Sequence, residues 1–147
     1  MASLTASLRL LTSVLAMPLV VGPAWAQESA PVPALTLELN GAQPSEKGCR
    51  LTFVVNNALG ADLSKAAFEI ALFNEAGVVD RLTVLDFKDL PAGKTKVTRF
   101  DLAGTDCAKI SRVLINSATE CAGTGIEPDA CMRGLKTETK TGIAFGV

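Results

Sequence analysis

Apolar and polar residues alternate along most of the chain after residue 33, and a period of two predicts β-strands. In the segment 34–40, leucine occupies every second position, with Thr36 and Glu38 between the leucines. Short runs of the same kind recur between turn-forming residues. The pattern predicts seven strands, at 34–40, 49–57, 66–74, 78–88, 94–102, 107–116 and 135–145.

Residues typical of turns separate these runs. The segment 41–48 (GAQPSEKG) is expected to be a turn or loop, and Gly77 is the expected left-handed residue of a hairpin at 74–77. After residue 26 no stretch of 10–12 residues shows the 3.6-residue period of a helix. The fold class is therefore all-β, an antiparallel immunoglobulin- or fibronectin type III-like β-sandwich of about seven strands.

Three runs depart from simple alternation. The apolar phase slips between Val84 and Leu85, which predicts a bulge or an edge bend there. The dense run 113–115 predicts a central strand covered on both faces, after a helical turn near Asp106. In 135–145, three threonines share the apolar face, which suits a half-buried strand and could also form an interaction edge.

Residues 1–26 form a different kind of segment. They hold no acid and a single base, Arg9, followed by an apolar run at 10–21 and the closing triplet Ala24-Trp25-Ala26. This is the pattern of a secretory signal peptide cleaved after Ala26. The apolar run is shorter than the roughly 20 residues of a membrane span. We expect a signal peptide at 1–26, a flexible lead-in at 27–33 and a single β-sandwich domain at 34–147, with no membrane span after cleavage.

Charge and composition disfavour several classes of function for this chain, as the charged residues and the missing residue types show. Without residues 1–26 the chain has 13 bases against 15 acids, a net charge of −2, and the bases are scattered. This distribution does not favour nucleic-acid binding, which needs concentrated Lys and Arg. The chain has no histidine and no tyrosine, which removes imidazole general bases, Ser-His pairs and His-based zinc sites. We expect a non-enzymatic protein without cofactor or metal.

The four cysteines are Cys49, Cys107, Cys121 and Cys131. An even number in an exported chain indicates two disulfides. Of the three possible pairings we favour Cys121–Cys131, the shortest loop, which leaves Cys49–Cys107. Neither a zinc site nor a redox pair is favoured, because no C-x-x-C spacing occurs.

Two groups of carboxylates are alternative candidates for chemistry. Glu120, Glu127 and Asp129 are close in sequence and could bind calcium, but they lack the EF-hand pattern, and a solvated loop is the favoured interpretation. A carboxylate-based hydrolase could use further acids near turns, although no sequence signal marks one as buried. These acids are Asp86, Asp89, Asp101 and Asp106.

Several stretches resemble a known class of module. Val55-Asn56-Asn57, the segment 70–74 followed by Gly77, the turn 90–94 and the segment 100–102 are similar to small bacterial extracytoplasmic immunoglobulin-like modules of the FxLYD and CARDB types. At the Phe-x-Leu-Tyr-Asp positions of the former stand Ile70, Leu72, Phe73 and Asn74, so that only the leucine is identical. The whole chain also resembles uncharacterised exported proteobacterial proteins. The resemblance implies a sandwich in the cell envelope and transfers no catalytic residue.

Together these features predict a periplasmic or secreted protein that acts as a non-catalytic binding or structural module of the cell envelope. An open sheet edge is the expected contact surface for an envelope protein partner. The alternative is an enzyme inhibitor or a carboxylate-based hydrolase that works through its loops.

The signal-peptide hypothesis predicts the first residue of the exported protein. Intact-mass and N-terminal peptide analysis of the protein from periplasm should find Gln27 at the N-terminus. Recovery of exported chains that retain residues 1–26 would contradict it.

Overall fold

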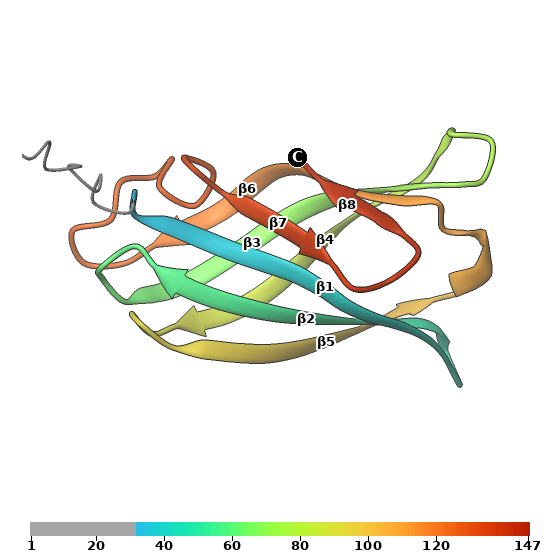
Figure 1. Cartoon of the computed structure of the whole chain (residues 1–147), viewed down its shortest axis with the longest axis horizontal. Helices are drawn as coiled ribbons and strands as arrows, with labels where there is room; N and C mark the ends of the chain where they lie inside the picture. Colours follow the sequence, from blue (N-terminus) through green and yellow to red (C-terminus); the bar gives the residue numbers. More distant parts are fainter. Residues whose placement is uncertain (1–31) are drawn as a thin grey trace, which may run out of the picture. The chain divides into compact units, whose positions relative to one another are not determined.

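The computed structural model describes residues 32–147 (Figure 1). The predicted signal peptide and residues 27–31 of the predicted lead-in lie outside the described residues. The described part contains eight strands and one short 3-10 helix. They are β1 Ala34–Ser45, β2 Gly48–Ala58, β3 Leu63–Phe73, β4 Val79–Leu90, β5 Thr95–Ala103, η1 Cys107–Lys109, β6 Arg112–Ala122, β7 Lys136–Thr139 and β8 Ala144–Gly146.

The strands form two four-stranded sheets, ordered β5-β2-β1-β7 and β4-β3-β6-β8. The predicted all-β sandwich with disulfides is confirmed. Most neighbouring strands are antiparallel, but β1 with β7 and β6 with β8 are parallel pairs. Both parallel pairs involve the C-terminal segment, which leaves one sheet and enters the other.

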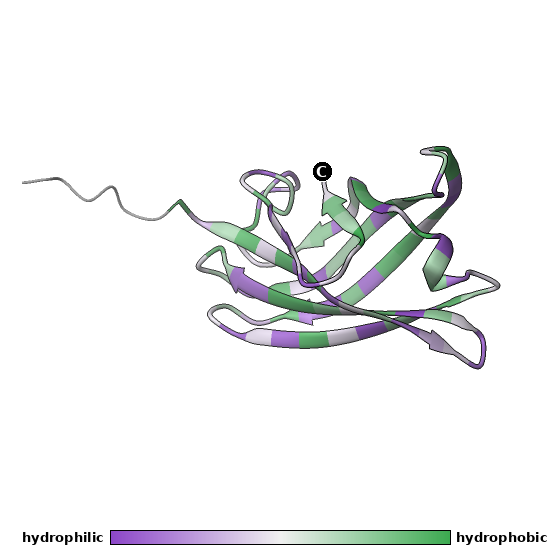
Figure 2. Cartoon of the chain, turned by 45° about the vertical axis from the view of Figure 1, so that its right-hand side comes forward, coloured by the Kyte–Doolittle hydropathy of each residue, from purple (hydrophilic) through white to green (hydrophobic). Residues whose placement is uncertain are grey.

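Alternation places the apolar side chains between the sheets. Figure 2 shows apolar and polar bands alternating along the strands. Leu35, Leu37 and Leu39 of β1 are fully buried, and Thr36 and Glu38 between them are half-buried. Five phenylalanines from both sheets meet edge to face in the core, with ring centroids 5.0 to 6.0 Å apart. They are Phe53, Phe68, Phe87, Phe100 and Phe145.

The predicted loop at 41–48 is wrong. β1 continues to Ser45, and only Glu46 and Lys47 form the turn before β2 begins at Gly48. A register shift between Leu39 and Gly41 leaves Asn40 out of the pairing with β2, and the strand continues beyond it. Gly48 is needed for close approach, because a Cβ atom there would collide with the backbone carbonyl oxygen of Leu102.

The predicted strand at 135–145 is two strands in different sheets, β7 and β8. Threonine hydroxyls make the bend between them. The backbone N–H of Thr141 donates to Thr139 Oγ1 at 3.1 Å, and the N–H of Ile143 donates to Thr141 Oγ1 at 3.1 Å. Local side-chain bonds of this kind offer the backbone an alternative to a ladder. The alternation of residues at 135–145 therefore runs across a bend and does not mark a single strand.

The predicted bulge near Val84 is displaced. β3 and β4 stay in register across Val84 and Leu85, and the shift lies at Phe87, followed by Lys88 with φ 63°. Val84 therefore lies on the outer face, while Leu85 is buried.

The prediction that the run 113–115 is covered on both faces is wrong, because Leu114 of β6 is only half-buried. The predicted helical turn is confirmed as η1, which Asp106 caps by accepting from the N–H of Ala108.

Both predicted disulfides are present. Cys49–Cys107 joins β2 to η1 with Cα atoms 4.9 Å apart, and Cys121–Cys131 closes the loop after β6 with Cα atoms 5.8 Å apart. The segment that contains η1 and the loop after β6 lie at opposite ends of the sandwich (Figure 1). Closing these loops in the unfolded chain corresponds to about 4 and about 3 kcal/mol respectively in the chain-entropy model.

Asn57 joins two turns at one end of the sandwich. Its side chain is buried, and its amide nitrogen donates to the carbonyls of Ala61 at 2.9 Å and Leu90 at 2.7 Å. Its amide oxygen accepts from the N–H of Leu59 at 3.0 Å. Its backbone also bonds to Gly93 and Lys94. One residue therefore satisfies polar groups of both the β2–β3 and the β4–β5 connections.

Replacing Asn57 with alanine should lower the free energy of unfolding by about 2–4 kcal/mol, because buried backbone groups lose their partners. Denaturant unfolding measures this. The matched control is Asn56→Ala, whose exposed amide bonds only to Thr95 Oγ1, and it should change stability by about 0.5 kcal/mol or less. Equal losses in the two variants would show that Asn57 does not have this role.

Candidate functional site

The loop between Cys121 and Cys131 is closely packed against the sandwich. Cys131 is fully buried, and its backbone N–H donates to Cys121 Sγ at 3.2 Å. At Gly123 the chain passes so near Asp62 that a Cβ atom would collide with the carbonyl oxygen of Asp62. Backbone bonds from Ile126 to Gly123 and from Ala130 to Glu127 fold the loop on itself. The predicted staple is thus a compact loop with a defined conformation.

The three acids that could bind calcium, Glu120, Glu127 and Asp129, do not form a cation site. Glu120 pairs with Lys65 at 2.5 Å, and Asp129 forms a two-pronged ion pair with Arg133. That hydrogen-bonded guanidinium lowers the pKa of Asp129 below its usual value. Glu127 has no ion pair among the described residues. Within residues 32–147, no group of three or more His, Cys, Asp or Glu side chains is placed to hold a metal ion.

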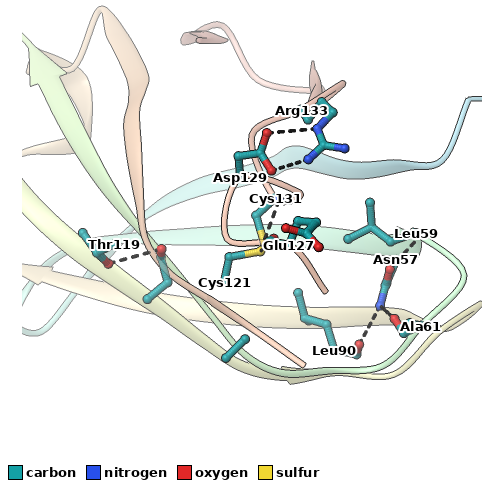
Figure 3. Close-up of a disulfide and its surroundings, with 12 residues drawn as sticks. Asn57, Leu59, Ala61, Leu90, Thr119, Cys121, Glu127, Asp129, Cys131 and Arg133 are labelled. Carbon is teal, nitrogen blue, oxygen red and sulfur yellow. Dashed lines mark hydrogen bonds and ion pairs between the residues drawn. A yellow bond between two sulfur atoms is a disulfide. The ribbon is translucent and has the colours of Figure 1, made fainter. Parts of the chain in front are cut away.

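A shallow hollow of about 300 Å³ lies beside this loop. The loop forms one wall, Val32 and Pro33 just before β1 form another, and the β2–β3 turn contributes Leu59. Figure 3 shows Glu127 between the disulfide and Leu59, with the Asp129–Arg133 pair close by. The lining residues are Val32, Pro33, Leu59, Gly125, Ile126, Glu127, Ala130 and Arg133. The sequence singled out Glu127, but it could not show which apolar residues lie beside it.

The acids considered for hydrolysis are engaged in separate structural contacts. Asp86 accepts from the backbone and side chain of Lys88, and the side-chain bond lowers the pKa of Asp86. Asp89 pairs at 3.3 Å with Lys96, which lies on β5 in the other sheet. Asp101 pairs with Arg50 at 3.0 Å, and this bond lowers the pKa of Asp101. Asp106 accepts from the N–H of Ala108 in capping η1, so each of the four acids has a structural partner of its own.

The four edge strands of the sandwich differ in length and in exposure. β7 and β8 have four and three residues, and threonines near them are engaged in the bend. β5 and β4, with nine and 12 residues, are the edge strands at the other side of the two sheets, which we call the open side. Among the described residues no strand is hydrogen-bonded to the outer side of β4, which pairs with β3 alone.

The outer face of β4 carries an apolar patch, which we call the β4 patch and define as Val79, Leu82 and Val84. Their side chains are 49%, 56% and 51% exposed. Leu82 lies opposite Ala71 on β3, which in turn lies opposite Leu114 on β6, so the apolar surface continues across the sheet. The sequence signal for this patch is the apolar phase slip between Val84 and Leu85, which predicts a bulge or an edge bend.

Charged side chains bridge the two ends of this open side. Lys96 on β5 donates to the backbone carbonyls of Phe87 at 3.2 Å and Asp89 at 2.8 Å, at the bulged end of β4. Arg81 on β4 donates to the carbonyl of Ala103 at 2.9 Å, at the far end of β5. Such contacts protect edges from uncontrolled pairing. The stretch of β4 between them, around Leu82 and Val84, has no such bridge in the described structure.

Comparison with protein-family models, curated proteins and solved structures finds no match to this chain. The part of the chain that the structure describes contains no helix long and apolar enough to cross a membrane.

Removing the partner of Asp129 should raise the pKa of this carboxyl toward its ordinary value. Carboxyl NMR titration of Arg133→Gln measures the shift, and Arg99→Gln, on the outer face of β5, should leave Asp129 unchanged. The pKa is lower in the folded than in the unfolded chain, so the pair stabilises the fold above the ordinary pKa. That contribution is lost as the pH falls through the lowered pKa. An unchanged titration in Arg133→Gln would contradict the ion pair.

Proposed function

We propose that this protein is an exported, periplasmic, non-catalytic binding module that accepts an extended segment of an envelope protein along β4. The observation that carries the proposal is an edge strand with an apolar outer face and a central stretch that the charged bridges leave open. An extended segment would continue the sheet by main-chain hydrogen bonds. Its alternate side chains would contact the β4 patch, which would give preference for apolar residues spaced two apart.

The other edges support this choice of strand. β7 and β8 are too short to guide a partner strand, and β5 carries the charged Arg99 and Asp101 on its outer face. Exposed apolar side chains on a long edge strand are uncommon, because they invite association. Their presence on β4, beside bridged ends, favours a specific contact.

Two further features support an envelope setting. Two disulfides suit an oxidising compartment outside the cytoplasm. The predicted signal peptide and the resemblance to extracytoplasmic immunoglobulin-like modules favour the periplasm. The non-catalytic character is supported by the engagement of Asp86, Asp89, Asp101 and Asp106 in separate structural contacts.

The double variant Leu82→Lys and Val84→Lys should reduce capture of the partner by about tenfold, since it loses apolar contacts and adds charge at their centre. The experiment compares cross-linked capture from periplasmic extract by the mature protein and by the variant, with mass spectrometry locating the cross-links. The control Val97→Lys places the same charge at an exposed valine of β5 on the other sheet, and its capture should be unchanged.

Thermal unfolding of each variant tests whether the fold is retained. We expect it to be, because all three side chains are about half exposed. The proposal requires cross-links that fall on β4 and are lost in the double variant. A partner that cross-links elsewhere, or that binds the double variant equally well, would overturn it.

A further inference from the structure

The hollow beside the Cys121–Cys131 loop combines an apolar lining with a charged group. Apolar side chains supply most of its wall, including Leu59 and Ile126, which also pack against the core. Its volume of about 300 Å³ is at the lower end of the range for small-ligand sites. It therefore has room for a small apolar group and no more.

The walls are held in place before any ligand arrives. Leu59 is fixed through its N–H bond to Asn57, and the disulfide holds the loop at both ends (Figure 3). The backbone N–H groups of Met132 and Arg133 both donate to the carbonyl of Asp129 as the chain leaves the loop. A preformed wall reduces the conformational entropy lost on binding.

The charges around the hollow do not cancel. Asp129 and Arg133 neutralise each other in their ion pair, which also fixes the guanidinium at the rim. Glu127 is exposed at the same rim and has no ion pair in the described part of the chain. Glu127, Asp129 and Arg133 together carry one net negative charge beside this apolar surface, although only Glu127 and Arg133 line the hollow.

We propose that this hollow is a binding site for a small apolar group that carries a protonated amine. The apolar group would lie against Leu59, Ile126 and Ala130, and the ammonium would pair with the carboxylate of Glu127. Such a group occurs both in free aliphatic or aromatic amines and at the amino terminus of an apolar peptide. This site is separate from the β4 patch, so it does not depend on the function proposed for that strand.

The test uses three probes that share one apolar body and differ in charge. They are 2-phenylethylamine, 2-phenylethanol and 3-phenylpropionate, titrated into the ¹⁵N-labelled mature protein. The amine should shift the amide signals of Leu59 and of residues 125–133, and it should bind about two- to fivefold more tightly than the alcohol. A dileucine amide and its N-acetylated form separate the peptide source from the free amine. Binding of the unacetylated form alone would assign the site to peptide amino termini as well.

Two variants separate charge from shape. Glu127→Gln should erase the preference for the amine over the alcohol, and the control Glu138→Gln, an exposed acid on β7, should retain it. Ala130→Phe should fill the hollow and weaken binding of every probe. The proposal is overturned if amine and alcohol bind the parent protein equally, if the carboxylate binds most tightly, or if the shifts lie away from the hollow.

Discussion

The packing of Phe53 against Phe87 ties the two sheets together. Phe53 lies on β2, and its ring also contacts Phe100 of its own sheet and Phe145 of the opposite sheet. Edge-to-face contacts of this kind require particular ring positions, so they fix how one sheet lies over the other. Both surfaces proposed for binding depend on this arrangement, because it decides which sheet edges face each other and which faces remain open.

The ends of the sandwich depend on different interactions from its centre. At one end Cys49–Cys107 joins β2 to the short helix that precedes β6. At the other end Asn57 and Cys121–Cys131 hold two turns and a long loop. Here the buried polar groups need partners, and a single asparagine provides three of them. The hollow lies at this end, and its wall residues Leu59 and Ile126 belong to segments held by Asn57 and by the disulfide.

The open side shows how the same fold can both avoid and permit association. Lys96 and Arg81 use their long side chains to bridge β4 and β5 at two places, and the bulge at Phe87 ends regular pairing. The exposed apolar side chains lie between these bridges. The 121–131 loop lies at the opposite end of the molecule from the β3–β4 hairpin (Figure 1). A strand partner and a small cationic ligand would therefore engage different parts of the surface.

The sequence by itself determined the fold class and the apolar faces of the first three strands, because alternation is a local property of the chain. It also predicted the disulfide pairing, because the shortest loop pairs Cys121 with Cys131 and leaves Cys49 and Cys107 for each other. It placed the segment 135–145 in one strand, since a period of two cannot reveal that threonine hydroxyls bend the chain between Thr139 and Ile143. It placed the bulge or edge bend of β4 at Val84 and Leu85, whereas the bulge lies at Phe87 and Val84 is simply outward-facing. Only the tertiary structure decided that β4 is an edge, and that Glu127 meets Leu59 across a hollow. Both facts arise from contacts between residues far apart in sequence, which no local pattern records.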